Sequence, residues 1–198
     1  MTDEYKTISG TSEGAYSELR SKFLAFAHPV TTVEEAMAVV EQYQKKFYDA
    51  RHVCWAYMLG PEREVFRSND NGEPSGTAGK PILGQINSFG LTDVAVVVVR
   101  YFGGIKLGTS GLIAAYREAA RLALEAAPKV VRHVEESMAF TFPYVSVNDV
   151  MKLIKQPGVT TEELTFDNAC SARVRIRRDD VERLRSRLGD VDGLTFTD

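Results

Sequence analysis

Hydrophobic and polar positions follow a strand period and a helical period in turn through the first two thirds of the chain. The run Val94–Val99 is apolar without alternation, which indicates a strand buried on both faces at the centre of a sheet. A capping box at Thr32 and Glu35 opens a helix whose apolar positions keep helical spacing. Similar patterns predict strands at residues 16–30, 52–59, 64–68 and 93–102, and helices at 32–49, from about 77, and from Thr109 or Ser110 to Pro128.

Shorter elements follow residue 132. Their order is strand, helix, strand, strand, helix, strand, predicted at 134–143, 145–155, 160–166, 172–178, 180–188 and 193–196. Within about 65 residues this order is typical of a ferredoxin-like domain, which has an antiparallel sheet with two helices on one face. We therefore expect an α+β protein with two α+β domains, residues 1–132 and 133–198.

Composition narrows the class of protein. With 44% hydrophobic and 26% charged residues, the 198-residue chain is globular rather than collagen-like, disordered or built on disulfides. The longest apolar run has six residues, whereas roughly 18 are needed to cross a bilayer. The N-terminus carries acids where a signal peptide carries bases, and two cysteines are too few for a disulfide framework. We expect a cytoplasmic protein with no membrane contact.

The charge balance limits how the chain can bind a polyanion. The formal net charge is -3, with 15 basic and 15 acidic residues up to residue 132 and 9 basic against 12 acidic beyond it. Neither part carries a basic tail. Because the overall field does not attract nucleic acid, phosphate contacts require a local basic patch.

The segment 69–81 is the first candidate site. It is rich in glycine, proline and turn residues and leads into the helix expected near Thr77. If the helix begins there, its first backbone N–H groups are unpaired. Gly76, Thr77 and Lys80 then place backbone donors, a hydroxyl and a cation around a phosphate or carboxylate. The alternative is an ordinary connection from hairpin to helix, in which the serine and threonine only cap.

The segment 100–111 is the second candidate site. A strand, a glycine-rich turn, a lysine and a hydroxyl-capped helix are the ingredients of a phosphate cradle. The spacing matches neither the Gly-Lys-Ser/Thr of a Walker loop nor the G-x-G-x-x-G of a dinucleotide site. The candidate phosphate contacts in this segment are Arg100, Gly103, Gly104, Lys106, Thr109 and Ser110.

Both glycine-rich segments contain a lysine near a helix start, and Arg51 and Arg67 come from the preceding hairpin. Together they can converge on one basic groove, with Tyr101 and Phe102 available to stack on bases. On spacing alone the alternative is equally open: the two aromatic rings complete the core and the arginines are solvated.

No catalytic residue is predicted. His52 and Cys54 share one face of a strand, as a Cys-His pair would, but a buried structural thiol is the favoured interpretation. Histidines and cysteines are too scattered for a metal site, so we expect neither a metal nor a cofactor. Asp70 and Glu73 could serve as acid and base or hold a metal, but acids in turns are mostly solvated, and we expect them to be so.

The second domain offers a further basic surface. Arg173, Arg175 and Arg177 alternate with apolar residues on a predicted strand, so all three share one sheet face. An exposed face of this kind can contact an RNA backbone or an acidic protein patch. Arginines that only keep an open sheet soluble are the alternative.

Four blocks of the chain carry a family resemblance: Ser21–Phe23, Ala50–Tyr57, Asp70–Ile82 and Val98–Gly108. In order and spacing they closely resemble the IMPACT family, specifically its bacterial YigZ-like branch. The resemblance covers most of residues 15–130, and the two glycine-rich blocks carry the family signature. The second domain is similar by pattern only.

The resemblance implies a first domain like the second domain of a small-subunit ribosomal protein and a second domain like the last domain of elongation factor G. It also implies an RNA- or ribosome-associated regulator of translation, since eukaryotic members restrain a starvation-sensing initiation kinase by competing for its activator. RNA or the ribosome is then the expected partner, with a protein of translation control as a further one. We expect a non-enzymatic regulator. The alternatives are an ATP- or phosphate-binding enzyme similar to small-molecule kinases, and a protein-interaction module.

Overall fold

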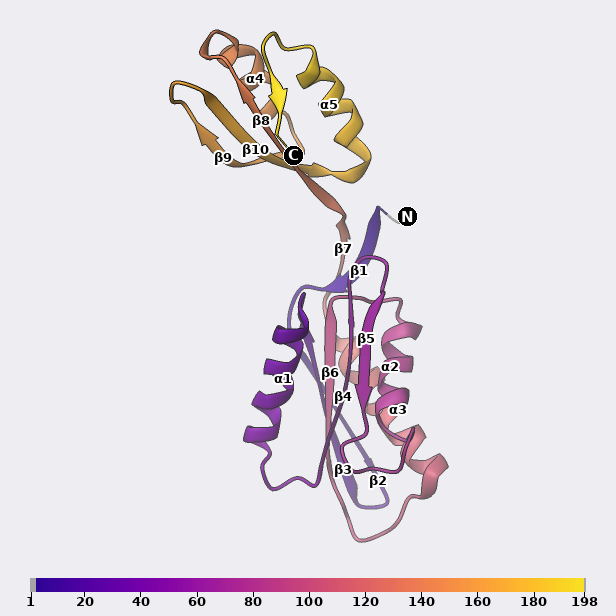
Figure 1. Ribbon diagram of the computed structural model, residues 1–198. Coiled ribbons are helices and arrows are strands. Elements are labelled where there is room, and N and C mark those ends of the chain that lie inside the picture. Colours follow the sequence, from indigo (N-terminus) through magenta and orange to yellow (C-terminus); the bar gives the residue numbers. More distant parts are fainter. Residues whose placement is uncertain (1–2, 198) are drawn as a thin grey trace. The chain divides into compact units, whose positions relative to one another are not determined.

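The structure is a computed structural model that describes residues 3–197 (Figure 1). It divides into two compact units, residues 4–132 and residues 133–197 with Asp3. The outer ends of the expected domains, residues 1–2 and 198, lie outside the described residues. Both units combine helices with antiparallel strands, which confirms the α+β class. None of the helices in residues 3–197 has the length and apolar character needed to span a membrane.

A five-stranded antiparallel sheet forms the centre of the unit 4–132, in the order β2-β3-β6-β4-β5. The middle strand, β6 (Val94–Tyr101), pairs with β3 on one side and β4 on the other, as the unbroken apolar run predicts. The remaining strands are β2 (Ser12–Glu18), β3 (Ser21–Pro29), β4 (His52–Leu59) and β5 (Val65–Asn69).

Helices cover both faces of this sheet, because alternate residues of the central strands point to opposite sides. Val97 and Val99 of β6 pack in the core beneath α1, and Val96 and Val98 pack in the core beneath α2 and α3. The bounds of the helices are α1 (Val33–Lys46), α2 (Gly79–Ser88) and α3 (Gly108–Ala126).

Two sequence predictions in this unit are wrong. The expected strand 16–30 is a hairpin, because Leu19 and Arg20 form a tight turn at φ of 45° and 68°. Turns of this kind normally contain Asn-Gly or Asp-Gly, so this turn lacks its usual signal. The expected caps of α3 also differ, since the helix begins at Gly108 without a side-chain cap. An unpredicted two-stranded sheet pairs β1 (Glu4–Ile8) with β7 (Lys129–His133).

The unit 133–197 contains the six elements predicted for it. Its sheet has the order β11-β8-β10-β9, and helices α4 and α5 pack in one core with Phe140, Val174 and Leu188. Short 3-10 turns precede both helices. The bounds are β8 (Glu135–Phe142), α4 (Val147–Ile154), β9 (Val159–Thr165), β10 (Cys170–Arg177), α5 (Val181–Gly189) and β11 (Thr195–Phe196).

Candidate functional site

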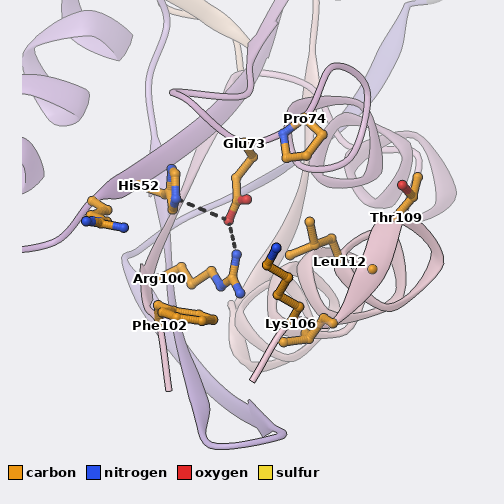
Figure 2. Close-up of a pocket in the computed structure, with 11 residues that line it drawn as sticks. His52, Glu73, Pro74, Arg100, Phe102, Lys106, Thr109 and Leu112 are labelled. Atoms are coloured by element: carbon orange, nitrogen blue, oxygen red, sulfur yellow. Dashed lines mark hydrogen bonds and ion pairs between the residues drawn. The ribbon is translucent and has the colours of Figure 1, made fainter. Parts of the chain in front are cut away.

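The two glycine-rich segments meet at one pocket of about 450 Å³ in the unit 4–132 (Figure 2). Segment 69–81 supplies one wall, and the connection from β6 to α3 supplies the opposite one. The start of β4 closes the third side. We call this site the central pocket; it is lined by Arg51, His52, Glu73, Pro74, Arg100, Phe102, Lys106, Leu107, Gly108, Thr109 and Leu112.

Glu73 is the buried acid of the central pocket, with a side chain only 3% exposed. Its Oε1 atom accepts hydrogen bonds from Arg100 Nη1 at 2.7 Å and from the Tyr116 hydroxyl at 2.7 Å. Burial raises the pKa of Tyr116 far above its usual range, so the phenol keeps its proton and remains a donor. The expectation that Glu73 is a solvated turn acid is therefore wrong: the carboxylate ties the loop to β6 and α3.

Arg100 forms part of the pocket floor rather than a free cation. Its side chain is 7% exposed and is neutralised by Glu73. The other guanidinium nitrogen, Nη2, donates to the Ser21 hydroxyl at 3.3 Å, and the group lies 5.5 Å from the centre of the Phe102 ring. Because its charge is already matched inside the protein, we assign Arg100 to the pocket floor rather than to a phosphate.

Arg51 and Lys106 supply the unmatched positive charge of the central pocket. Both side chains are exposed, and neither forms an ion pair within residues 3–197. Figure 2 shows the Lys106 amine pointing toward the centre of the pocket beside Arg100. Since Glu73 balances Arg100, the lining carries a net positive charge at neutral pH, and an anion is the ligand it favours.

His52 has a defined orientation in the same pocket. Its Nδ1 lies 2.9 Å from the Asn71 carbonyl oxygen, which can only accept, so Nδ1 carries the hydrogen. The other nitrogen, Nε2, faces Glu73 Oε1 at 3.9 Å. His52 therefore lines the pocket with the Nε2 side of its ring.

The start of α2 is already occupied by an internal anion. The Asp70 carboxylate accepts from the backbone amides of Gly76, Ala78 and Gly79 at 2.8–3.1 Å. The Thr77 side chain is buried, and its hydroxyl donates to the Pro74 carbonyl at 2.6 Å. The donors that Gly76 and Thr77 were expected to offer a phosphate are thus taken within the chain, by the Asp70 carboxylate and by the Pro74 carbonyl respectively.

Asp70 predicts a measurable acid sensitivity. Burial alone raises its pKa, but the three amide donors and the nearby Lys80 outweigh burial and hold the pKa below 3.8. A carboxyl with a lowered folded-state pKa stabilises the fold above its unfolded pKa and loses that contribution as the pH falls through the folded value. We expect Asp70→Asn to lower the urea midpoint at neutral pH and to approach wild type below about pH 4. A difference that stays constant from neutral pH into this range contradicts the assignment.

The other predicted contacts lie away from the central pocket. Arg67 rests 5.7 Å from the Trp55 ring centre, and Lys80 and Gly76 line a separate groove between α2 and α3. Gly103 packs against the hairpin turn, where an added Cβ would lie 2.1 Å from the Arg20 carbonyl carbon. Of the predicted residues, the pocket brings together Arg51, Arg100, Lys106 and Thr109 and leaves out Arg67, Gly76, Thr77, Lys80, Gly103, Gly104 and Ser110.

Two of the three exposed arginines of β10 form ion pairs with acids of the neighbouring strands. Arg173, Arg175 and Arg177 are all exposed and alternate with buried residues, as predicted. Arg173 lies 3.7 Å from Glu163, while Arg175 lies 2.9 Å from Glu135 and 3.3 Å from Glu162. Acids on the two neighbouring strands therefore neutralise part of this face, while Arg177 stays exposed, and a second basic surface remains a prediction.

Sequence reasoning missed the buried polar cluster behind the central pocket. The Cys54 thiol lies 3.0 Å from the Asp70 carbonyl oxygen and 3.4 Å from the Tyr116 hydroxyl, which in turn donates to Glu73. Nothing in the local pattern distinguishes Tyr116 from an ordinary core aromatic. Residues 3–197 contain no group of three or more His, Cys, Asp and Glu side chains placed to hold a metal ion.

Comparisons with known proteins place the central pocket within one family domain. The model of the Impact N-terminal domain matches residues 19–124. The IMPACT family member YvyE of Bacillus subtilis is 32% identical over 166 residues, 84% of this chain and 76% of that protein. The E. coli member YigZ is 43% identical over 99 residues, about half of each chain. A crystal structure of a hypothetical protein aligns with a TM-score of 0.79 and 28% identity over 99% of this chain and 97% of its own.

Proposed function

The chain belongs to the IMPACT family, in the branch that includes YigZ, and from that membership we propose that it is an RNA- or ribosome-associated regulator of translation in the cytoplasm. Translation control is the role that the family resemblance implies. The observation that supports RNA binding is the unpaired positive charge of Arg51 and Lys106, in a pocket whose one acid, Glu73, is already paired with Arg100. This local charge stands out in a chain of net charge -3.

The proposed binding mode uses the pocket walls for separate parts of a nucleotide. Arg51 and Lys106 contact a phosphate, and the Thr109 hydroxyl in the first turn of α3 adds a donor near the positive end of the helix dipole. The Phe102 ring is 47% exposed and offers a stacking surface for a base. Arg100 and Glu73 hold the floor without contacting phosphate.

We also propose the finer domain description. In the unit 133–197 the sheet order places the fourth strand beside the first and the third beside the second, which is the arrangement of a ferredoxin-like domain. This topology and the family together support the resemblance of the unit 133–197 to the last domain of elongation factor G. For residues 4–132, the resemblance to a ribosomal-protein domain rests on the family. Fold likeness supports RNA association only as analogy.

A salt series tests the proposal. Each phosphate contact contributes about 0.7 to the slope of log K against log salt for a single strand. We expect Arg51→Gln combined with Lys106→Gln to weaken RNA binding and to reduce that slope by about 1.4. The matched control is Lys45→Gln combined with Lys152→Gln, which removes the same charge from exposed ion pairs and should leave the slope unchanged. No RNA binding by the wild type, or equal slopes, contradicts the proposal.

A second candidate function has one observation in its favour. The central pocket has the size of small-molecule sites. An ATP- or phosphate-binding enzyme would use the same two cations. Such a protein gains thermal stability when ATP and magnesium are added, because a ligand bound only by the folded state stabilises it. A regulator that binds only RNA is stabilised no more by ATP with magnesium than by uridine monophosphate, whereas the enzyme prefers the triphosphate.

A further inference from the structure

A second cationic groove lies on the side of the unit 4–132 that α2 and α3 cover. It runs between α2 and α3, has a volume of about 400 Å³ and contains no acid among its lining residues. Its two cations, Lys80 and Arg117, are exposed. We call it the α2–α3 groove; it is lined by Gly76, Lys80, Pro81, Gly84, Gln85, Ser88, Ile113 and Arg117.

The groove and the central pocket share two walls. In the loop before α2, Pro74 lines the central pocket and Gly76 lines the groove. Along α3, Thr109 and Leu112 line the pocket, and Ile113 and Arg117 line the groove. Eight residues of helix separate Thr109 from Arg117, a rise of about 12 Å. An extended chain that leaves the pocket along α3 therefore meets the groove.

The two sites offer different chemistry. The central pocket combines cations with the exposed Phe102 ring, so it can hold a base together with a phosphate. The groove has no aromatic lining residue, but it presents two cations and two glycines. A Cβ added at Gly84 would meet nothing within 4 Å, so the surface there is open. Cations on an open surface suit a sugar-phosphate backbone and give no base readout.

We infer that the central pocket and the α2–α3 groove form one track for single-stranded RNA. The pocket holds one unstacked nucleotide, and the groove holds the backbone of the nucleotides that follow. A duplex fits this track poorly, because a base must leave its stack to enter the pocket beside Phe102. The inference rests on the proposed function and adds to it the strand class and a second contact surface.

Oligonucleotide length separates the two sites. Uridine monophosphate and labelled oligouridine of two and eight nucleotides are titrated at low salt, with an eight-base-pair RNA duplex as a further ligand. The groove variant is Lys80→Gln with Arg117→Gln, the pocket variant is Arg51→Gln with Lys106→Gln, and the control is Lys45→Gln with Lys152→Gln. All exchanged side chains are exposed, and thermal melts verify that each variant folds.

We expect the groove variant to bind the octamer roughly tenfold more weakly than wild type, with a slope lower by about 1.4, while its binding of the monophosphate is unchanged. The pocket variant should lose affinity for both ligands, and the wild type should prefer the octamer to the duplex. If the groove variant binds the octamer as wild type does, or the duplex binds as tightly as the octamer, the track is wrong although RNA binding stands. If the wild type binds no RNA at all, the proposed function fails.

Discussion

Glu73→Ala is expected to lower the unfolding free energy of the unit 4–132 by about 3–5 kcal/mol. The substitution leaves the Arg100 guanidinium buried without its counter-charge and removes the acceptor of the Tyr116 hydroxyl. A buried charge that loses its partner cannot recover its hydration, which is why the cost exceeds that of an exposed pair. Urea unfolding followed by tryptophan fluorescence measures it, because the single tryptophan, Trp55, is buried in this unit.

Two further variants identify the cause of that loss. Glu41→Ala removes a glutamate 2.9 Å from Lys45, but that pair is exposed, so the unfolding midpoint should not change measurably. Adding Arg100→Met to Glu73→Ala removes both buried charges and should recover a large part of the lost stability. If Glu73→Ala is as stable as the wild type, or if the double variant recovers no stability, the buried ion pair is not what holds the loop before α2 in place.

The buried pair also explains how a charged pocket can keep its shape. Arg100 comes from β6, Glu73 from the loop before α2, and Tyr116 from α3, so one carboxylate connects three elements that are distant in sequence. The connection neutralises the inner cation and leaves Arg51 and Lys106 to the ligand. Because the walls are held by buried hydrogen bonds, the pocket is preorganised, and binding needs little reordering of the protein.

Regular elements could be predicted from the sequence where the pattern is local. The unbroken valine run identified the central strand β6, and the capping box at Thr32 identified the start of α1, where its hydroxyl accepts from the Glu35 amide at 3.1 Å. The turn at Leu19 and Arg20 could not be found, since neither residue is typical of positive φ. Gly103, more than 80 residues away, leaves room for this turn, since an added Cβ would lie 2.1 Å from the Arg20 carbonyl carbon.

The site was predictable in its cations and not in its acids. Lys106 stands out because it lies in a glycine-rich segment before a helix, where anions bind, and Arg51 is a cation at the start of the neighbouring hairpin. An acid in a turn carries no such local signal: Asp70 reaches amides six to nine residues further on, and Glu73 finds its partners 27 and 43 residues away. Whether these partners come within reach of the two acids depends on how distant elements of the chain pack together. The sequence could not show that Lys106 lines the central pocket and Lys80 does not, because this too depends on how distant elements pack.

Cys54 is expected to resist thiol reagents in the folded protein far more strongly than an ordinary cysteine. Burial raises the pKa of the Cys54 thiol from 9.0 to about 12. Since the thiolate is the reactive form, its fraction at mildly alkaline pH falls by about a thousandfold. The side chain is also 0% exposed, so a reagent reaches it only when the unit opens. The thiol then acts as a structural group beside Tyr116 and not as a nucleophile.

Labelling of Cys170→Ala with a thiol-reactive dye tests this, because only Cys54 then remains. We expect the native protein to react at least a thousandfold more slowly than the same variant in urea. Glu73→Ala, which destabilises the unit, should raise the labelling rate in proportion to its larger open population, since labelling proceeds through the unfolded form. A native rate near that of a free thiol would place Cys54 at the surface and reopen the Cys-His interpretation with His52. If labelling is slow and Glu73→Ala does not change its rate, the contacts of Glu73 with Arg100 and Tyr116 do not limit access to this thiol.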